Sequence, residues 1–410
     1  MTYPGFAKIG LIFALLAPLP AAAHAEDGYD LWLRYRPLDV AHVAQYAPHA
    51  TAVTGGDSPT LVAARQELQR AMAGMLGKDV RSGSTDGQVI LGTPDNSPTI
   101  KALNLPLANL GPEGFLIRSV TVDGHPATVI AGNSDVGVLY GTFRFISLMQ
   151  TERSLNKLDI SDAPKIRVRV LDHWDNLDGS VERGYAGKSI WDWWRLPDLK
   201  DTRYIDYARA DASVGINGVV LNNVNAKADS LTAPYIAKTQ AVAAILRPYG
   251  IKVYLSARFS APMELGGLKT ADPLDPQVRA WWKAKADEIY AAIPDFGGFL
   301  VKANSEGQPG PGDYKRTHAD GANMLAEAVA PHGGIVMWRA FVYSEKDATD
   351  RAKQAFNDFV PLDGKFAPNV IVQVKNGPID FQPREPFHPM FGAMPHTRLM
   401  FEGQITKEYL

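Results

Sequence analysis

Residues 296–311, FGGFLVKANSEGQPGP, join a short apolar run to a loop that is rich in glycine and proline. Residues 299–301 form the apolar run, Lys302 follows them, and Glu306 lies in the loop. A buried strand that delivers a cation and then a carboxylate into a rigid loop is typical of an active site at the end of a barrel strand. Lys302 could equally be a cation that reaches water from a strand end, with Glu306 an ordinary loop acid.

The same strand-like pattern recurs from residue 164 onward and alternates with stretches of helical spacing. The candidate strands are 168–173, 218–222, 252–257, 298–303, 335–341, 370–374 and 398–401, and the helical stretches are 204–214, 236–247, 278–292, 321–330 and 348–356. Apolar, β-branched strands that alternate with helices indicate parallel βα units. Because no GxGxxG or GxxxxGK[ST] loop occurs, the pattern favours a TIM-type (β/α)8 barrel over a nucleotide-binding open sheet. The seventh strand lies close to Leu410, so we expect a C-terminally truncated barrel over 164–410 with about seven strands.

Residues 26–163 predict a small α/β accessory domain. Residues 61–76 and 136–149 have apolar residues at helical spacing, and the strands 114–122 and 127–131 flank an Asp123-Gly124 turn. No catalytic constellation occurs in this part, which favours a scaffold or accessory role.

Residues 1–25 read as a signal peptide. Lys8 supplies a positive charge, residues 9–19 form an apolar segment, and Ala23-His24-Ala25 resembles a cleavage site. An uncleaved membrane anchor is the alternative, but prolines break the segment and it is short for a bilayer. We therefore expect an exported protein, periplasmic or extracellular, with no membrane attachment after cleavage.

Composition excludes several classes of function. The net charge is −2 and no long block of one sign occurs, so nothing supports a nucleic-acid partner. The chain has no cysteine, which excludes disulfides, thiolate catalysis and cysteine-ligated metals.

Three neighbouring strands each carry one cation near the carboxyl end. These are Lys302 in FLVKAN, Arg339 in IVMWRAF and Lys375 in IVQVKNG. Isolated cations in an apolar strand layer are costly and are seldom left unpaired. Structural ion pairs with acids such as Asp380 or Glu345 would explain them, but the regular placement favours a pocket for a small anionic ligand.

Carboxylates follow the same strands. Glu306 follows the fourth strand, Asp380 follows the sixth, and Glu408 follows the seventh. One acid facing a pair of acids is the layout of glycosidic-bond hydrolysis, in which one group protonates the leaving oxygen and another activates water or attacks carbon.

Aromatic and amide side chains surround the predicted site. Trp174 ends the first strand, and residues 191–194 (WDWW) lie in the loop after it, where they could stack on sugar rings or pack the loop. Asn222, Asn223 and Asn225 after the second strand could bind hydroxyl groups or cap loops.

Metal and serine chemistry have little support. Asp172, Asp175 and Asp178 lack the alternate spacing of a calcium loop, and neither HxH nor HExxH occurs. No GxSxG elbow is present. We therefore predict no metal and no cofactor.

Several long motifs resemble the α-glucuronidases of glycoside hydrolase family sixty-seven. They are GYDLWLRY (28–35), LDHWDNLDGSVERGYAGKSIW (171–191), GINGVVLNNVNA (215–226), GFLVKANSEGQPGPGDY (298–314), VQVKNGPIDFQPREP (372–386) and FEGQITKEYL (401–410). The resemblance covers essentially everything after residue 25.

The resemblance implies removal of α-1,2-linked 4-O-methyl-D-glucuronic acid from xylan-derived oligosaccharides (aldouronic acids), with inversion and without a metal. By motif, Glu306 takes the position of the general acid, and Asp380 and Glu408 take the positions that share activation of water. Lys302, Arg339 and Lys375 match positions that hold the uronate, and Trp174 matches a wall of the sugar pocket. The family continues into a helical domain, so a homodimer is expected only in the full-length protein.

Our hypothesis is therefore an exported, inverting α-glucuronidase or the N-terminal part of one. One alternative is a non-catalytic fragment that binds uronate or xylooligosaccharides, and another is a barrel glycosidase that retains anomeric configuration.

Overall fold

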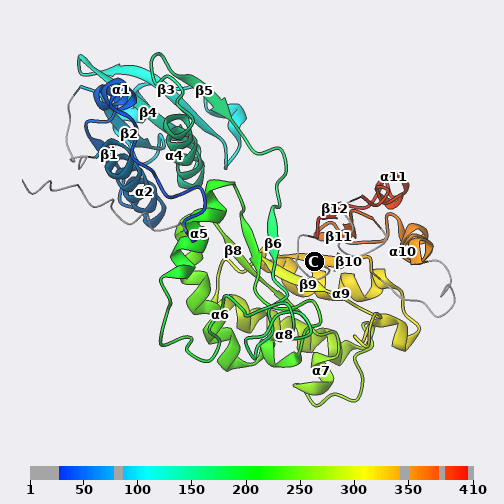
Figure 1. Ribbon diagram of the computed structural model, residues 1–410. Helices are drawn as coiled ribbons and strands as arrows, with labels where there is room; N and C mark the ends of the chain where they lie inside the picture. Colours follow the sequence, from blue (N-terminus) through cyan, green and yellow to red (C-terminus); the bar gives the residue numbers. More distant parts are fainter. Residues whose placement is uncertain (1–26, 78–85, 342–350, 378–383, 405–410) are drawn as a thin grey trace, which may run out of the picture.

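The computed structural model describes residues 27–77, 86–341, 351–377 and 384–404 (Figure 1). Two sheets follow one another along the chain, and each is packed against helices. The predicted signal peptide lies outside the described residues, and the boundary at 163/164 stays a prediction. Within the described ranges, no helix has the length and apolarity to cross a bilayer.

The first sheet has five strands in the order β1-β2-β4-β3-β5. Their bounds are Val53–Gly55 (β1), Gln88–Gly92 (β2), Phe115–Val122 (β3), His125–Gly132 (β4) and Asp159–Asp162 (β5). β1, β2 and β4 are parallel, whereas β3 runs antiparallel to β4 and β5. The predicted hairpin is confirmed: Val122 pairs with His125 across Asp123 and Gly124, which both have positive φ as type I′ turns require.

Helices cover this sheet on both faces. They are α1 (Val40–Tyr46), α2 (Pro59–Leu76), α3 (Pro98–Ala102) and α4 (Asp135–Gln150). Ser58 caps the N-terminus of α2 through its hydroxyl, and Gly77 ends the helix in the left-handed conformation. α2 and α4 pack together over the larger core, while α3 covers a smaller core on the opposite face.

The second sheet has seven strands, all parallel, each hydrogen-bonded to its neighbour in chain order. They are β6 (Val170–Asp172), β7 (Gly218–Val220), β8 (Lys252–Ser256), β9 (Gly298–Val301), β10 (Ile335–Arg339), β11 (Val370–Lys375) and β12 (Leu399–Glu402). All seven predicted strands are therefore confirmed, although the first five, β6 to β10, each end one or two residues earlier than expected.

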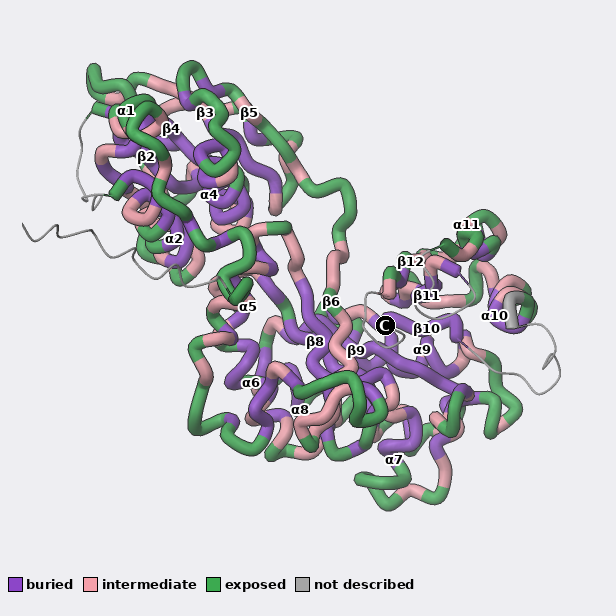
Figure 2. The backbone as a smooth tube through the Cα atoms, viewed as in Figure 1, coloured by how far each residue is buried: buried purple, intermediate pink, exposed green. Residues whose placement is uncertain are grey.

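Helices follow most of these strands. They are α5 (Arg203–Ser213), α6 (Ala233–Leu246), α7 (Ala261–Glu264), α8 (Pro276–Ala292), α9 (His318–Val329), α10 (Arg351–Phe359) and α11 (Met390–Ala393). A large apolar core fills the space between the strands and these helices, and Figure 2 shows the central strands as buried. A second, small core on the inner face includes Val220, Tyr254, Leu300 and Met337.

The seven-stranded sheet is curled. Residues of its first strand, β6, and of its last strand, β12, line one and the same cavity together with inner-face residues of the strands between them. An open, flat parallel sheet would hold its two edges far apart. The fold is therefore α/β with a curled, all-parallel sheet.

A buried ion pair joins the two parts of the chain. Glu67 on α2 accepts hydrogen bonds from Arg209 on α5 at 2.7 and 2.8 Å, and from the hydroxyl of Tyr35. Arg209 also donates to Asp206 at 2.8 Å, and Arg70 donates to Glu67 at 3.1 Å. We call this group the junction network.

Candidate active site

The three predicted cations lie side by side at the carboxyl ends of adjacent strands. Arg339 and Lys375 are the last residues of β10 and β11, and Lys302 follows the end of β9. Trp338 pairs with Val301, so Lys302 and Arg339 are at the same level. The predicted placement of these cations at one end of the sheet is confirmed.

Strand periodicity turns these side chains toward the inner face. Leu300 and Met337 belong to the inner core, and Lys302 and Arg339 each lie two residues further along the same strand direction. Side chains at i and i+2 share a face of a strand. Burial follows from this, because Lys302, Arg339 and Lys375 are only 3%, 1% and 5% exposed.

The cations gather around one aromatic ring, that of Phe341. The Lys375 Nζ lies 3.8 Å from the centroid of this ring, the Lys302 Nζ lies 5.3 Å from it, and the Arg339 Cζ lies 5.3 Å from it. Arg339 also lies 5.6 Å from the centroid of Trp174. These distances are within the range of cation–π attraction.

Lys302 and Glu306 form an ion pair across four residues of chain. The Lys302 ammonium also donates to the Asn225 side chain at 2.8 Å, and Arg183 donates to the other Glu306 oxygen at 3.2 Å. Burial lowers the pKa of Lys302, and the hydrogen bond and charge of Glu306 act against that shift. Glu306 is thus held between two cations, Lys302 and Arg183. It lies at the end of the sheet where the strands have their carboxyl ends, which we call the mouth.

Hydrogen bonds and close packing fix the conformation of the loop that carries Glu306. Glu306 and Gly307 both have positive φ, and a hydrogen bond from Gln308 to the Ser305 carbonyl closes the turn at 2.9 Å. The Asn304 side chain accepts from the Gly312 amide at 2.8 Å. A Cβ on Gly310 would lie 2.3 Å from that Asn304 oxygen, so only glycine fits there.

Arg339 pairs with a different carboxylate, that of Glu402, which the sequence analysis missed. Glu402, the last residue of β12, accepts from Arg339 at 2.9 and 2.5 Å and from Gln373 at 2.7 Å. Burial alone would raise the pKa of Glu402, but the charge and hydrogen bonds of Arg339 hold it below the usual value. Asp172 on β6 lies in the same field, and burial raises its pKa to about 7 against the opposing charge of Arg339.

A cavity of about 370 Å³ lies beside this group on the inner face. Trp174, Asp172 and Glu402 line it, together with apolar residues such as Leu300 and Met337. Glu306 and the three cations, Lys302, Arg339 and Lys375, are not among its lining residues. Trp174 and Glu402 therefore connect the cavity to the cations, since both contact Arg339.

Other predicted site residues have different positions. Trp193 is buried in the outer core, whereas Trp194 is 66% exposed. Asn222 exchanges hydrogen bonds with Ser256 on the neighbouring strand, and Asn223 caps the turn at Asn225, so the loop-capping alternative describes these two. Among the three asparagines, the structure places Asn225 against a site residue, Lys302.

Two of the three predicted catalytic carboxylates, Asp380 and Glu408, lie outside the described residues. The same is true of Glu345, which the sequence suggested as a structural ion-pair partner. Their assignments stay predictions. Within the described residues, Lys302 forms an ion pair with Glu306, and Arg339 forms one with Glu402.

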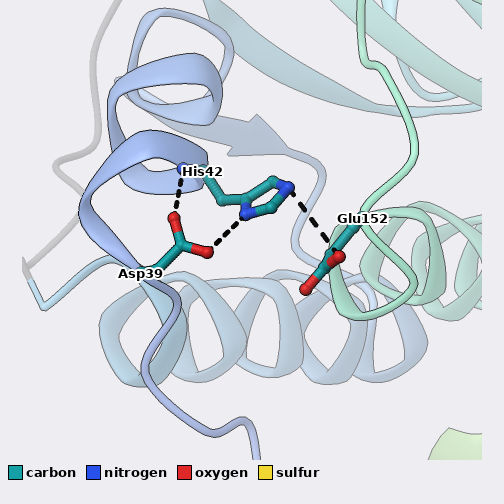
Figure 3. Close-up of side chains that lie close together, drawn as sticks. All are labelled: Asp39, His42 and Glu152. Carbon is teal, nitrogen blue, oxygen red and sulfur yellow. Dashed lines mark hydrogen bonds and ion pairs between the residues drawn. The ribbon is translucent and has the colours of Figure 1, made fainter.

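One cluster of potential metal ligands occurs in the described residues, far from these cations in the chain. Asp39, His42 and Glu152 have ligand atoms within 4.8 Å of one another on the first α/β part (Figure 3). Asp39 caps α1 and pairs with the His42 Nδ1 at 2.8 Å, while Glu152 lies 3.9 Å from the Nε2. Each ring nitrogen thus faces a carboxylate, which explains the grouping without an ion.

A simple signal could have found the missed residues. Glu402 lies two positions after Met400, and Phe341 two after Arg339, so strand periodicity places each on the inner face. Arg183 lies in a loop, where no periodicity exists, and its contact with Glu306 depends on the fold.

Comparison with known proteins identifies the family. Residues 31–145 match the glycosyl hydrolase family 67 N-terminus, and residues 148–410 match the glycosyl hydrolase family 67 middle domain. A solved structure titled "Structure of CpGH84D" is 13% identical, with a TM-score of 0.50, and covers 79% of this chain and 52% of that chain. This last likeness concerns the fold alone.

Curated relatives extend the match along the chain. A "Probable alpha-glucuronidase A" from Aspergillus fumigatus is 44% identical over 97% of this chain and 48% of its own length. An "Alpha-glucuronidase" from Hypocrea jecorina is 40% identical over 98% of this chain and 49% of its own length. The chain thus spans about half the length of these relatives. By both of its matched regions, the chain belongs to glycosyl hydrolase family 67.

Proposed function

We propose that the protein is an α-glucuronidase that removes α-1,2-linked (4-O-methyl-)D-glucuronic acid from xylan-derived oligosaccharides. The observation that carries this proposal is the set of three buried cations, Lys302, Arg339 and Lys375, at adjacent strand ends beside Glu306. A uronic acid brings one carboxylate, which such a group of cations binds favourably. Membership of the family and the names of the curated relatives support the same substrate class.

In this proposal Glu306 is the general acid. Its turn places it at the mouth, 29% exposed, and the Lys302 pair tethers its side chain before substrate binds. The carboxylate of the substrate would replace Glu306 as the ion-pair partner of Lys302. Protonated Glu306 would then donate its proton to the departing xylosyl oxygen. Asp380 and Glu408 would activate water on the opposite face, with inversion.

Inversion sets a distance that a structure with substrate can check. The acid and the base must be about 6.5–9.5 Å apart to leave room for water between base and sugar. A separation of about 5 Å from Glu306 to both of its partners would instead indicate retention.

We further propose that the curled sheet is the main part of a (β/α)8 barrel. β6 and β12 are the two edges that face each other across the cavity, and exposed sheet edges are normally paired or covered. In this proposal residues 26–163 are an accessory domain, residues 164–410 belong to the catalytic barrel, and residues 1–25 direct export.

The test is product analysis on aldouronic acids. The full-length protein and this 410-residue chain are assayed in parallel for release of 4-O-methylglucuronate. Proton NMR of the first-formed anomer should show the β-anomer, because inversion of an α-link gives β. An α-anomer would contradict inversion, and binding of glucuronate without any release by the full-length protein would favour the non-catalytic alternative.

A further inference from the structure

The ring of Phe341 lies at the centre of the three cations that the proposed function uses. Lys375, Lys302 and Arg339 place their charged groups 3.8, 5.3 and 5.3 Å from its centroid. Phe341 is itself only 8% exposed. It follows Arg339 by two residues, which gives it the same inward direction.

Three buried cations at this spacing repel one another. Like charges several ångströms apart repel strongly where water is largely excluded. Burial lowers the pKa of Lys302, and the neighbouring charge of Arg339 acts in the same direction. A favourable contact at the centre of the group would offset part of this repulsion.

Two carboxylates supply part of that compensation from the side. Glu306 pairs with Lys302, and Glu402 pairs with Arg339. The electron-rich face of the Phe341 ring adds to it, because an aromatic face attracts cations most strongly where water is excluded. Lys375 makes the closest of the three approaches to the ring.

We infer that Phe341 is a positioning residue that determines specificity for acidic sugars. Its ring keeps the three cations, Lys302, Arg339 and Lys375, charged and close together. A single carboxylate of the ligand can then replace those of Glu306 and Glu402 and be bound by all three cations. An aliphatic side chain would fill the same volume without attracting the cations. A carboxylate would then bind less tightly, whereas a neutral sugar would bind as before.

The inference rests on the proposed function only in the identity of the ligand, a uronate. Its test is binding, measured by calorimetry with D-glucuronate and, as the neutral match, D-glucose, on the full-length protein. Phe341→Leu should weaken glucuronate binding about ten-fold and leave glucose binding unchanged, the ten-fold loss corresponding to cation–π contacts at a desolvated site. Phe341→Tyr keeps an aromatic ring at this position and should bind glucuronate with the affinity of the wild type.

A matched control is Phe299→Leu. Phe299 lies on the neighbouring strand β9, is fully buried, and packs in the outer core, away from the cations. This variant should lose stability but keep the ratio of glucuronate to glucose affinity. An equal ratio in Phe341→Leu and wild type would overturn the inference.

Replacement of Phe341 by pentafluorophenylalanine keeps the test decisive if Phe341→Leu does not fold. That side chain has nearly the shape of phenylalanine but lacks the negative ring face. It should reproduce the ten-fold loss, and wild-type selectivity in this variant would overturn the inference. Hydrolysis by the wild-type protein is assayed separately, so an inactive enzyme with Phe341-dependent glucuronate selectivity would refute the proposed function and leave this inference standing.

Discussion

The junction network and the cation group at the sheet mouth are both built from buried charges, yet they are arranged in opposite ways. At the junction, one carboxylate, Glu67, accepts from several donors of both parts of the chain. At the mouth, three cations surround the neutral ring of Phe341, and their acids come from the side.

This difference separates a structural role from a binding role. Glu67 is 2% exposed and enclosed by its donors, so a ligand cannot replace it. Glu306 is 29% exposed on a turn at the mouth, so a carboxylate from solution can compete for Lys302. Removing an acid at the junction should therefore cost stability, and removing one at the mouth should cost activity.

The largest expected effect is that of Glu306→Gln. If Glu306 is the general acid of the proposed function, its loss should lower kcat on aldouronic acids by about a thousandfold, because proton donation to the leaving group is lost. The thermal midpoint should also fall, because the buried Lys302 loses the carboxylate that compensates its charge. kcat is therefore compared at a temperature at which both proteins are folded. Glu327→Gln is the control, because Glu327 is also an ion-paired acid, with Arg279, but lies on an outer helix. Retention of full activity by Glu306→Gln would remove the contrast between the two regions.

The next effect is that of Glu67→Gln at the junction. It leaves the guanidinium of Arg209 buried with weaker compensation, which should lower the unfolding free energy by about 3 kcal/mol in urea titrations. Arg70→Gln removes a half-exposed donor to the same carboxylate and should cost less than about 1 kcal/mol. Folded Glu67→Gln should keep wild-type kcat, and a fall in kcat at full occupancy of the folded state would show that the junction also serves catalysis.

The two regions also differ in how far the sequence predicts them. Strand and helix periodicity predicted all seven parallel strands, because each is a short apolar run with a defined partner face. The same periodicity located Lys302, Arg339 and Lys375 at one end of the sheet. The junction pair joins Glu67 to a residue 142 positions away, and no local pattern encodes such a distance.

Within the site the limit of prediction was similar. Glu402 and Phe341 obey strand periodicity, but their roles depend on the curl that brings β12 and the Phe341 ring to Arg339. Arg183 reaches Glu306 across 123 residues from a loop. Periodicity therefore gives the face on which a residue lies, whereas partners across the sheet follow only from the assembled fold.

The smallest expected effect is the pH dependence of stability that Asp172 causes. Because burial raises the pKa of Asp172 from 3.8 to about 7, the folded protein retains a proton that the unfolded chain has lost. Its contribution to stability is therefore present below about pH 4 and is lost as the pH rises toward 7. Partial solvent screening reduces the size of this decline to about 1–2 kcal/mol.

Asp172→Asn should flatten that decline, because asparagine does not ionise. Urea titrations between pH 4.5 and pH 7.5 measure it, and Asp178→Asn in the loop after the same strand is the control. Hydrogen bonds from Ser180 lower the pKa of Asp178, so that residue titrates below this window and its removal should leave the slope as in wild type. An Asp172→Asn slope equal to that of wild type would mean that Arg339 keeps Asp172 ionised alongside Glu402. The mouth would then resemble the junction, with one guanidinium matched by two charged acids, and the contrast between the regions would rest on Phe341 alone.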